Sequence, residues 1–368
     1  MYTFLEASKT SLNNLDQYDT VRVIMGNPTC DLDSAVCALV YAFHNHTDAQ
    51  AKNENITTIP LFNIPKSEFR LKTEVLHYFQ IHSIPSDLLT FRDQIDLKTL
   101  GNEGKLEIIL VDHHTLPEED RSLVNSVVEI IDHRPLDQAW LWPERLTNIE
   151  LVGSCASLIA KKCIEKKSII LDRLVCSLLR GAILIDTANF SKTANKATST
   201  DVEVIQKLEM IGSITSNRDE EYQKLIFAKT DISSLSPSDL LIKDLKIANG
   251  IPMPGLPLLV QDFLTMDGAF EALTRFTMQH NSSVTVVMGL SFVNNTITRD
   301  IAIFSLNPDE LHSRILEKLT TSTNPSLNLT EVETFSNRSE YNCVLLKLGN
   351  LQASRKQVLP IIASITID

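Results

Sequence analysis

Four short runs of almost wholly apolar residues constrain the fold of this 368-residue chain more than any other feature. A continuous apolar strand suits a parallel sheet that helices cover on both faces, because both sides of such a strand are then buried. Helical patterns between the runs supply the crossovers that parallel strands require. We therefore predict that residues 1–205 form an α/β domain with a doubly wound, mostly parallel sheet. The apolar runs are residues 21–25, 59–64, 106–111 and 127–131, and the main helical patterns are residues 34–46, 67–80, 153–165 and 171–185.

Residues 206–368 follow a different pattern, and the chain is long enough for two domains. Two β-rich runs, 283–293 and 298–305, predict a hairpin with its turn at Asn294 and Asn295. We predict that this second, smaller domain is of the α+β class with some antiparallel pairing. Its other predicted elements are helices at 308–320 and 355–365 and a strand at 341–348.

Acidic and imidazole side chains follow three of the apolar runs. The first run leads into a loop with Asp31 and Asp33, the third into Asp112, and the fourth into His133. The carboxyl ends of parallel strands line the ligand crevice of an open α/β sheet. Asp and His are poor core residues without partners, so core packing alone does not explain this pattern. We therefore predict a cluster of carboxylates and imidazole at one edge of the sheet.

Such a cluster favours a divalent metal site. Carboxylate oxygens with a little imidazole suit Mg²⁺ or Mn²⁺, and two ions about 4 Å apart can activate water for attack on a phosphoryl group. Asp186 ends a buried apolar segment, where an unpaired acid costs several kcal/mol. Each residue also has a plainer interpretation: Asp31 and Asp33 as an N-cap and a turn acid, His133 as a structural histidine, and Asp186 as a helix-end acid.

Four segments, GNPTCDLDS (26–34), VDHH (111–114), IDHRP (131–135) and GAILIDT (181–187), resemble the four motifs of the DHH phosphoesterase superfamily. Asn27, the triplet 132–134 and the segment 152–158 resemble the prune-type exopolyphosphatases in particular. The resemblance implies a DHH domain followed by a DHHA2-type domain, with hydrolysis of short-chain polyphosphate at two divalent ions. It implies that Asp112 bridges the ions. The implied metal ligands are Asp31, Asp33, Asp112, His133 and Asp186.

The formal net charge of −12 disfavours nucleic acid as a partner and requires local cations for any anionic substrate. The resemblance assigns such cations to Lys246, in a D-x-K pattern, and to Arg355 and Lys356, which follow a serine. Arg355 and Lys356 also precede an apolar helical run, and cations are unfavourable in the first turn of a helix unless an anion binds there. Arg134 is a fourth candidate.

Two positions depart from the family pattern. Asn27 stands where many relatives have a histidine ligand, and an amide oxygen is a weaker ligand, which favours Mg²⁺ or lowers the occupancy of one site. Arg134 replaces the second histidine of the triplet; it binds phosphate oxygens but is no acid at neutral pH. His114 or a bound water then supplies the proton. The predicted catalytic residues are thus Asp112, His114 and Arg134, and the predicted substrate-binding residues are Asn27, Arg134, Lys246, Arg355 and Lys356.

We therefore predict an exopolyphosphatase, with two alternatives. A cyclic-nucleotide phosphodiesterase needs aromatic rings for base stacking, and only 6% of the residues are aromatic. A weakly active scaffold that binds nucleoside diphosphate kinase, a partner associated with this branch, is the other. We expect a cytoplasmic location because the N-terminus lacks an apolar signal segment, although an atypical mitochondrial signal would escape this reasoning. No run of 18 apolar residues predicts a membrane span.

Overall fold

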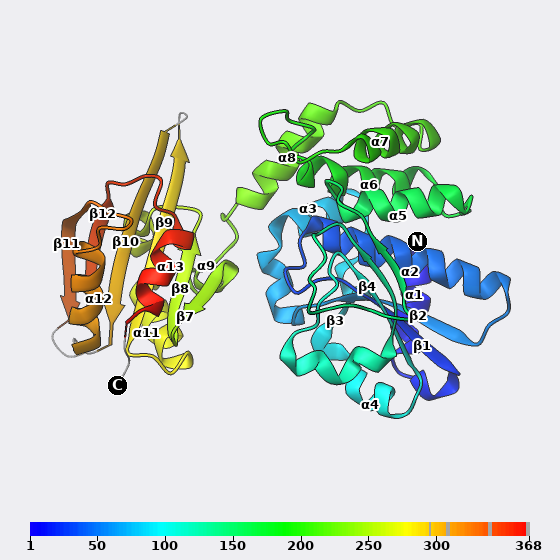
Figure 1. The fold of residues 1–368 in the computed structure, drawn as a ribbon, viewed down its shortest axis with the longest axis horizontal. Coiled ribbons are helices and arrows are strands. Elements are labelled where there is room, and N and C mark those ends of the chain that lie inside the picture. The colour runs from blue at the N-terminus through cyan, green and yellow to red at the C-terminus, as the bar shows by residue number, and fades with distance from the viewer. Residues whose placement is uncertain (294–295, 307–309, 338–340, 366–368) are drawn as a thin grey trace. The chain divides into compact units, whose positions relative to one another are not determined.

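The computed structural model describes residues 1–293, 296–306, 310–337 and 341–365, and the chain forms two compact units, 1–231 and 232–368 (Figure 1). The boundary lies later than the predicted one at 205/206. The reason is that two further helices, α7 (Ser199–Ile211) and α8 (Arg218–Thr230), belong to the first unit. Their side chains Leu208 and Leu225 are buried in the core of that unit.

The first unit is built on a six-stranded parallel sheet with the order β3-β2-β1-β4-β5-β6. The chain winds outward from β1 to β2 and β3, then returns to place β4 on the other side of β1. Ligand crevices of open α/β sheets form where the winding reverses in this way, beyond the carboxyl ends of the strands. The strands are β1 Thr20–Met25, β2 Ile56–Phe62, β3 Thr90–Phe91, β4 Leu106–Val111, β5 Val127–Asp132 and β6 Leu146–Ile149.

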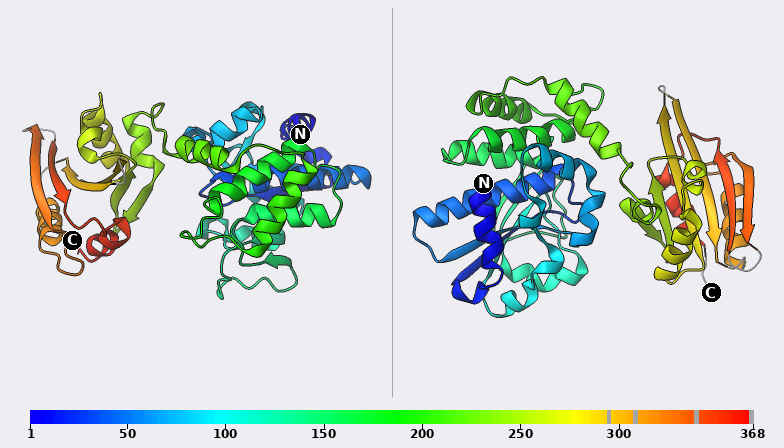
Figure 2. Two further views of the ribbon diagram at one scale, coloured as in Figure 1. Left: turned by 90° about the horizontal axis from the view of Figure 1, so that it is seen from above. Right: turned by 180° about the vertical axis from the view of Figure 1, so that it is seen from behind.

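Helices cover both faces of this sheet, as the views in Figures 1 and 2 show. On β1, Ile24 is buried in the core shared with α2, α5 and α6, whereas Val23 and Met25 are buried in a second core with α4. Both faces of the strand are therefore apolar, and the predicted doubly wound α/β fold is confirmed. The helices of this unit are α1 Tyr2–Ser11, α2 Leu32–Ala51, α3 Thr73–Ile81, α4 Leu97–Asn102, α5 Cys155–Glu165, α6 Arg173–Asp186, α7 and α8, with 3-10 turns at Leu15–Gln17, Lys66–Leu71, Ser86–Leu88, Arg92–Gln94 and Glu118–Ser126.

The second unit is a mixed sheet with the order β11-β12-β10-β9-β8-β7, in which β8 and β9 pair in parallel. The predicted hairpin strands pair antiparallel from Thr296 and Val293 onward, while the predicted turn residues Asn294 and Asn295 lie outside the described residues. Helices α12 and α13 share a core with one face of the sheet, which confirms the predicted α+β class. The elements are α9 Pro237–Lys243, β7 Leu245–Ala248, β8 Ile251–Leu256, α10 Val260–Leu264, α11 Ala269–Gln279, β9 Val284–Val293, β10 Thr296–Ser305, α12 Glu310–Thr320, β11 Leu329–Asn337, β12 Tyr341–Leu348 and α13 Arg355–Ala363.

Across the described ranges, no helix has both the length and the apolar character needed to cross a bilayer.

One close helix contact in the first unit yields a stability prediction. Gly181 lies in α6, and a Cβ there would clash with the ring and hydroxyl of Tyr78, which donates to Ser177 O at 2.6 Å. We expect Gly181→Ala to lower the free energy of unfolding by about 1–3 kcal/mol through overpacking, although Ala is the better helix former. Urea unfolding measures this. Gly101→Ala is the matched control, because its methyl group would lie 3.4 Å from the nearest atom, Ser126 Oγ. An equal loss of stability in the two variants would contradict the packing argument.

Candidate metal centre

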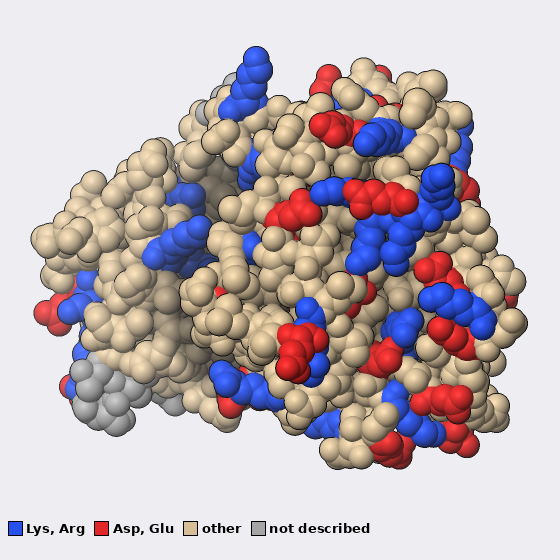
Figure 3. All heavy atoms as spheres, turned by 45° about the vertical axis from the view of Figure 1, so that its right-hand side comes forward, with Lys and Arg blue, Asp and Glu red and all other residues tan. Residues whose placement is uncertain are grey.

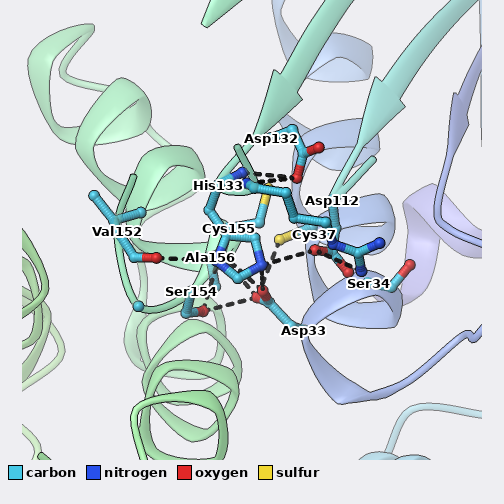
Figure 4. Close-up of polar contacts among 12 residues, drawn as sticks. Asp33, Ser34, Cys37, Asp112, Asp132, His133, Val152, Ser154, Cys155 and Ala156 are labelled. Atoms are coloured by element: carbon cyan, nitrogen blue, oxygen red, sulfur yellow. Dashed lines mark hydrogen bonds and ion pairs between the residues drawn. The ribbon is translucent and has the colours of Figure 1, made fainter. Parts of the chain in front are cut away.

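Three neighbouring strands of the first unit deliver the predicted ligands to one place. Asp33 follows β1 in the first turn of α2, Asp112 follows β4, and His133 follows β5. One ligand atom from each of these three residues lies within 4.8 Å of the other two. In Figure 4 the His133 ring lies between Asp112 and Asp33. The structure thus brings together the residues that the strand ends predict.

Asp112 is the most constrained member of this cluster. It is buried, and its φ of +61° lies in the left-handed region that side chains other than Gly rarely adopt. Its Oδ2 accepts a hydrogen bond from Asn27 Nδ2 at 2.6 Å, whereas its Oδ1 has no hydrogen-bond partner among the described residues. Burial, together with the charges of Asp33 and Asp31, raises the pKa of Asp112 to about 7. A buried carboxylate oxygen that accepts no hydrogen bond requires an explanation, and a role as a metal ligand is one.

His133 has the orientation typical of a metal-binding histidine. Its Nδ1–H donates to Val152 O at 3.1 Å, which leaves Nε2 facing Asp112 Oδ1 at 3.2 Å and Asp33 Oδ2 at 4.0 Å. Ligand histidines commonly bond a backbone carbonyl in this way, since it fixes the tautomer and the ring. Burial alone would lower the pKa of His133, but the neighbouring carboxylates raise it to about 10. The protonated His133 ring therefore compensates part of the negative charge of these carboxylates.

The carboxylate of Asp33 is held by the N-terminus of α5 (Figure 4). Its Oδ1 accepts from Ser154 Oγ and Ala156 N, each at 2.8 Å, and its Oδ2 accepts from Cys155 N at 2.7 Å. The free N–H groups of a first helical turn are suited to bind a carboxylate, so this arrangement fixes the position of the Asp33 side chain. Its oxygens retain lone pairs for a cation.

Asp31 and Asp186 lie outside the three-residue cluster but interact with it electrostatically. Asp31 is the N-cap of α2 and accepts from Ser34 N at 3.2 Å, so its plainer interpretation also holds. Asp186 is the last residue of α6. Burial raises the pKa of both carboxyl groups, and the charge of Asp33 raises them further. Four carboxyl groups are therefore gathered at one place, where their charges repel one another.

These observations fit a divalent cation. The donors are carboxylate oxygens and one neutral imidazole nitrogen, a set that Mg²⁺ and Mn²⁺ accept. Asp112 Oδ1 accepts no hydrogen bond from the described residues, and together with the raised carboxyl pKa values this indicates that His133 and Arg134 compensate the negative charge only in part. A cation would remove this cost, because an opposite charge favours the ionised form of each carboxyl group.

The predicted cations of the second unit line a separate cavity of about 380 Å³. Arg355, the first residue of α13, pairs with Asp244 Oδ1 at 2.5 Å and donates to Met253 O at 3.2 Å. Gly255 makes room for this guanidinium, since a Cβ there would lie 2.8 Å from Arg355 Nη1. Lys246, Lys356 and also Arg299 line the same cavity. The two sequence patterns that contain Lys246 and Arg355 thus meet in space.

The comparisons with known proteins agree with this architecture. The chain is 34% identical over 353 residues to "Exopolyphosphatase PRUNE1" of Rattus norvegicus, which covers 95% of this chain and 76% of the relative. The human protein of the same name gives the same identity and coverage. The model of the DHHA2 domain matches residues 223–365. The chain belongs to the prune family of DHH phosphoesterases.

A solved structure shares the fold of this family member. It is from Methanococcus jannaschii and is described as a family II inorganic pyrophosphatase, with a TM-score of 0.52 and 20% identity. The match covers 93% of this chain and 98% of the archaeal one. At this level of identity, the likeness shows the fold and leaves the chemistry to the residues themselves.

Asn27 holds Asp112 through its side-chain amide. Its Oδ1 accepts from Thr29 N at 2.8 Å and from Cys30 N at 3.0 Å, and its Nδ2 donates to Asp112. Because two backbone N–H groups require an oxygen, the orientation of the amide is settled. The side chain is buried, and both of its polar atoms are engaged in these hydrogen bonds. Substrate binding by Asn27 stays a prediction.

The hydrogen bonds of His114 argue against the predicted proton donor. Its Nδ1 pairs with Asp132 Oδ2, and its Nε2 accepts from Asp137 N at 2.9 Å. Asp132 in turn accepts from the backbone N–H groups of His133 and Arg134 at 2.7 and 3.2 Å. Because both ring nitrogens are engaged in these hydrogen bonds, we propose that His114 positions the 132–134 loop, and its role as a proton donor stays a prediction. Arg134 itself is half-exposed, with Nη2 at 3.7 Å from Asp112 Oδ1, as a substrate-binding group requires.

The sequence reasoning missed the donors that hold Asp33. Two of the three are backbone N–H groups, which carry no signal in a sequence. The sequence does indicate the capping role of Ser154, because a serine before an apolar helical run is a common N-cap. It gives no sign that Ser154 also contacts Asp33, which lies far away in the sequence.

The raised carboxyl pKa values predict how the metal-free protein responds to pH. Between the ordinary pKa of 3.8 and about 7, folded Asp112 binds more protons than the unfolded chain, so its contribution to stability falls as pH rises through this window. We therefore expect Asp112→Asn to gain stability relative to wild type from about pH 4 to about pH 7. Calorimetric melting in a chelator measures the difference. Added Mn²⁺ should stabilise wild type and reverse the order at neutral pH; a pH-independent difference without metal would contradict the raised pKa of Asp112.

Proposed function

We propose that this chain is a metal-dependent phosphohydrolase that releases phosphate from short-chain inorganic polyphosphate. The observation that carries the proposal is the cluster of buried Asp33 and Asp112 with half-buried His133, in which Asp112 Oδ1 accepts no hydrogen bond from the described residues and faces only the cationic groups of His133 and Arg134. The names of the relatives support the substrate class, since both PRUNE1 proteins are called exopolyphosphatases. A phosphoanhydride is cleaved by water in such a reaction, and the cluster is suited to hold the ions that assist it.

The residues of the first unit have distinct tasks in this mechanism. Asp31, Asp33, Asp112, His133 and Asp186 would hold two divalent ions, Mg²⁺ or Mn²⁺. Such ions, when bound, polarise phosphoryl oxygens and lower the pKa of water. Asn27 and the α5 N-terminus keep Asp112 and Asp33 oriented toward them. Arg134 presents its planar donors to phosphate oxygens beside Asp112.

The second unit would supply the cations that an anionic chain requires. Lys246, Arg355 and Lys356 line its cavity, and Arg355 is kept rigid by Asp244. Arg355 and Lys356 lie in the first turn of α13, where their charge is unfavourable unless an anion binds. Acidic and basic side chains are interspersed on the face drawn in Figure 3, so that face offers no broad basic surface for nucleic acid.

A leaving group that is already a stable phosphate needs little protonation. This matches a site where Arg134 replaces a histidine and where His114 is fully engaged in hydrogen bonds. None of the described residues that line the cation cavity is aromatic, which favours an inorganic chain over a nucleotide whose base would stack. Binding to nucleoside diphosphate kinase and a cytoplasmic location stay predictions.

Removal of one metal ligand tests the proposal. We expect Asp112→Ala to lower phosphate release from tripolyphosphate by more than about a hundredfold, because the ions lose the carboxylate shared by the cluster. Glu107→Ala is the control: Glu107 lies on β4, the strand that Asp112 follows, but pairs with Arg22, and the activity of this variant should be unchanged. Phosphate release is measured with cyclic AMP as the comparison substrate. Turnover retained by a folded Asp112→Ala protein, or faster hydrolysis of cyclic AMP, would refute the proposal.

The cation cavity gives an independent test. We expect Lys356→Ala to raise the KM for tripolyphosphate by about tenfold with a smaller effect on kcat, because a desolvated ammonium–phosphate contact contributes roughly 1.5–3 kcal/mol. The effect should shrink at high salt, which screens the contact. Lys347→Ala is the control, since Lys347 is exposed on β12 and does not line the cavity. Equal KM values for the two variants would show that the cavity does not bind the substrate.

A further inference from the structure

Asp201 is a fully buried carboxylate that stands outside the proposed metal ligands. It lies in the first turn of α7, and its relative exposure is 0%. Four hydrogen bonds converge on it, two from one distant segment of the chain and two from its own helix start. The donors are Gly153 N at 2.8 Å, Thr198 N at 2.7 Å, Thr198 Oγ1 at 2.7 Å and Ser157 Oγ at 2.6 Å.

Helix capping explains only half of these bonds. Thr198 and Asp201 form the capping box of α7, which accounts for the two bonds from Thr198. The bonds from Gly153 and Ser157 reach across to a segment that precedes α7 by about forty residues. A carboxylate that served α7 alone would not need to be buried at 0% exposure, where its charge is costly.

The distant segment is the one that orients Asp33. Residues 154–156 provide the three donors to the Asp33 carboxylate, from Ser154 Oγ, Cys155 N and Ala156 N. Gly153 and Ser157, the two residues that bond to Asp201, flank these donors on either side. Asp201 therefore holds both ends of the segment whose centre holds Asp33.

The packing around Gly153 leaves little freedom in this arrangement. A Cβ on Gly153 would lie 2.6 Å from Thr187 Cγ2, 2.9 Å from Asp201 Oδ2 and 3.0 Å from Lys196 O. Thr187 directly follows Asp186, another proposed ligand. A displacement of the 153–157 segment would thus change the positions of both Asp33 and Asp186.

We propose that Asp201 is a positioning residue for the metal centre. It fixes the 153–157 segment through hydrogen-bond acceptance, and the segment in turn fixes the Asp33 carboxylate. The inference rests on the proposed metal-dependent function. Asp201 acts through its hydrogen bonds rather than through its charge, so an asparagine at this position should replace it. The asparagine oxygen would accept from Gly153 and Thr198, and its amide nitrogen would donate to the Ser157 hydroxyl, which then acts as the acceptor.

The experiment measures the binding of Mn²⁺ alone to the metal-free full chain by titration calorimetry, with no substrate present. We expect Asp201→Ala to raise the Kd by about 10–100-fold, as the loss of outer partners of metal ligands typically does. Asp201→Asn should stay within about threefold of wild type because it keeps the acceptors. Asp300→Ala is the matched control: Asp300 is a buried carboxylate of the second unit that accepts from Val260 N and Gln261 N, and its loss should lower stability without changing the Kd.

Each outcome decides the inference. A folded Asp201→Ala protein with the Kd of wild type would overturn it, as would a folded Asp201→Asn protein that binds as weakly as Asp201→Ala. If Asp201→Ala does not fold by circular dichroism, Ser157→Ala replaces it, and this loss of one bond should raise the Kd by about threefold or more; an unchanged Kd would overturn the inference. Absence of Mn²⁺ binding by wild type would refute the metal centre itself, and this inference with it.

Discussion

Four carboxyl groups are gathered at the carboxyl end of the parallel sheet, and the repulsion between their charges is the constraint on which the surrounding structure depends. Burial and the neighbouring charges raise the pKa of Asp112 and of Asp186. The same charges raise the pKa of His133, whose imidazolium supplies part of the missing positive charge. An arrangement that costs stability in the metal-free chain becomes favourable once a divalent cation is bound.

The groups around the ligands serve to hold them in this unfavourable proximity. Val152 fixes the ring of His133, Asn27 fixes one oxygen of Asp112, and the first turn of α5 fixes Asp33. Such partners are neutral donors and acceptors, so they orient the ligands without cancelling the charge that attracts the ion. Asn27 fits this scheme, because its amide donates to Asp112 and so positions a proposed ligand.

Charge is distributed differently in the two units. The ligand cluster of the first unit is strongly acidic, whereas the cavity of the second unit is lined by Lys246, Arg355 and Lys356. A chain with a net charge of −12 can therefore still bind a polyanion, provided that its cations are gathered at one place. The ion pair of Arg355 with Asp244 keeps one of these cations preorganised, which lowers the entropy lost on binding.

The sequence by itself determined four strands of the first sheet and three of the second, the positions of Asp33, Asp112 and His133 after their strands, and the α/β and α+β classes, because apolar runs and strand-end acids are local patterns. Only the tertiary structure decided which side chains remain free to react. The polar atoms of His114 and Asn27, for example, form hydrogen bonds with Asp137, Thr29 and Cys30, and only the structure shows these contacts. The unit boundary after Asp231 likewise depended on whether α7 and α8 pack on the first core. Contacts of this kind join residues that lie far apart in the chain or use backbone atoms common to every residue, and so no local pattern of side chains records them.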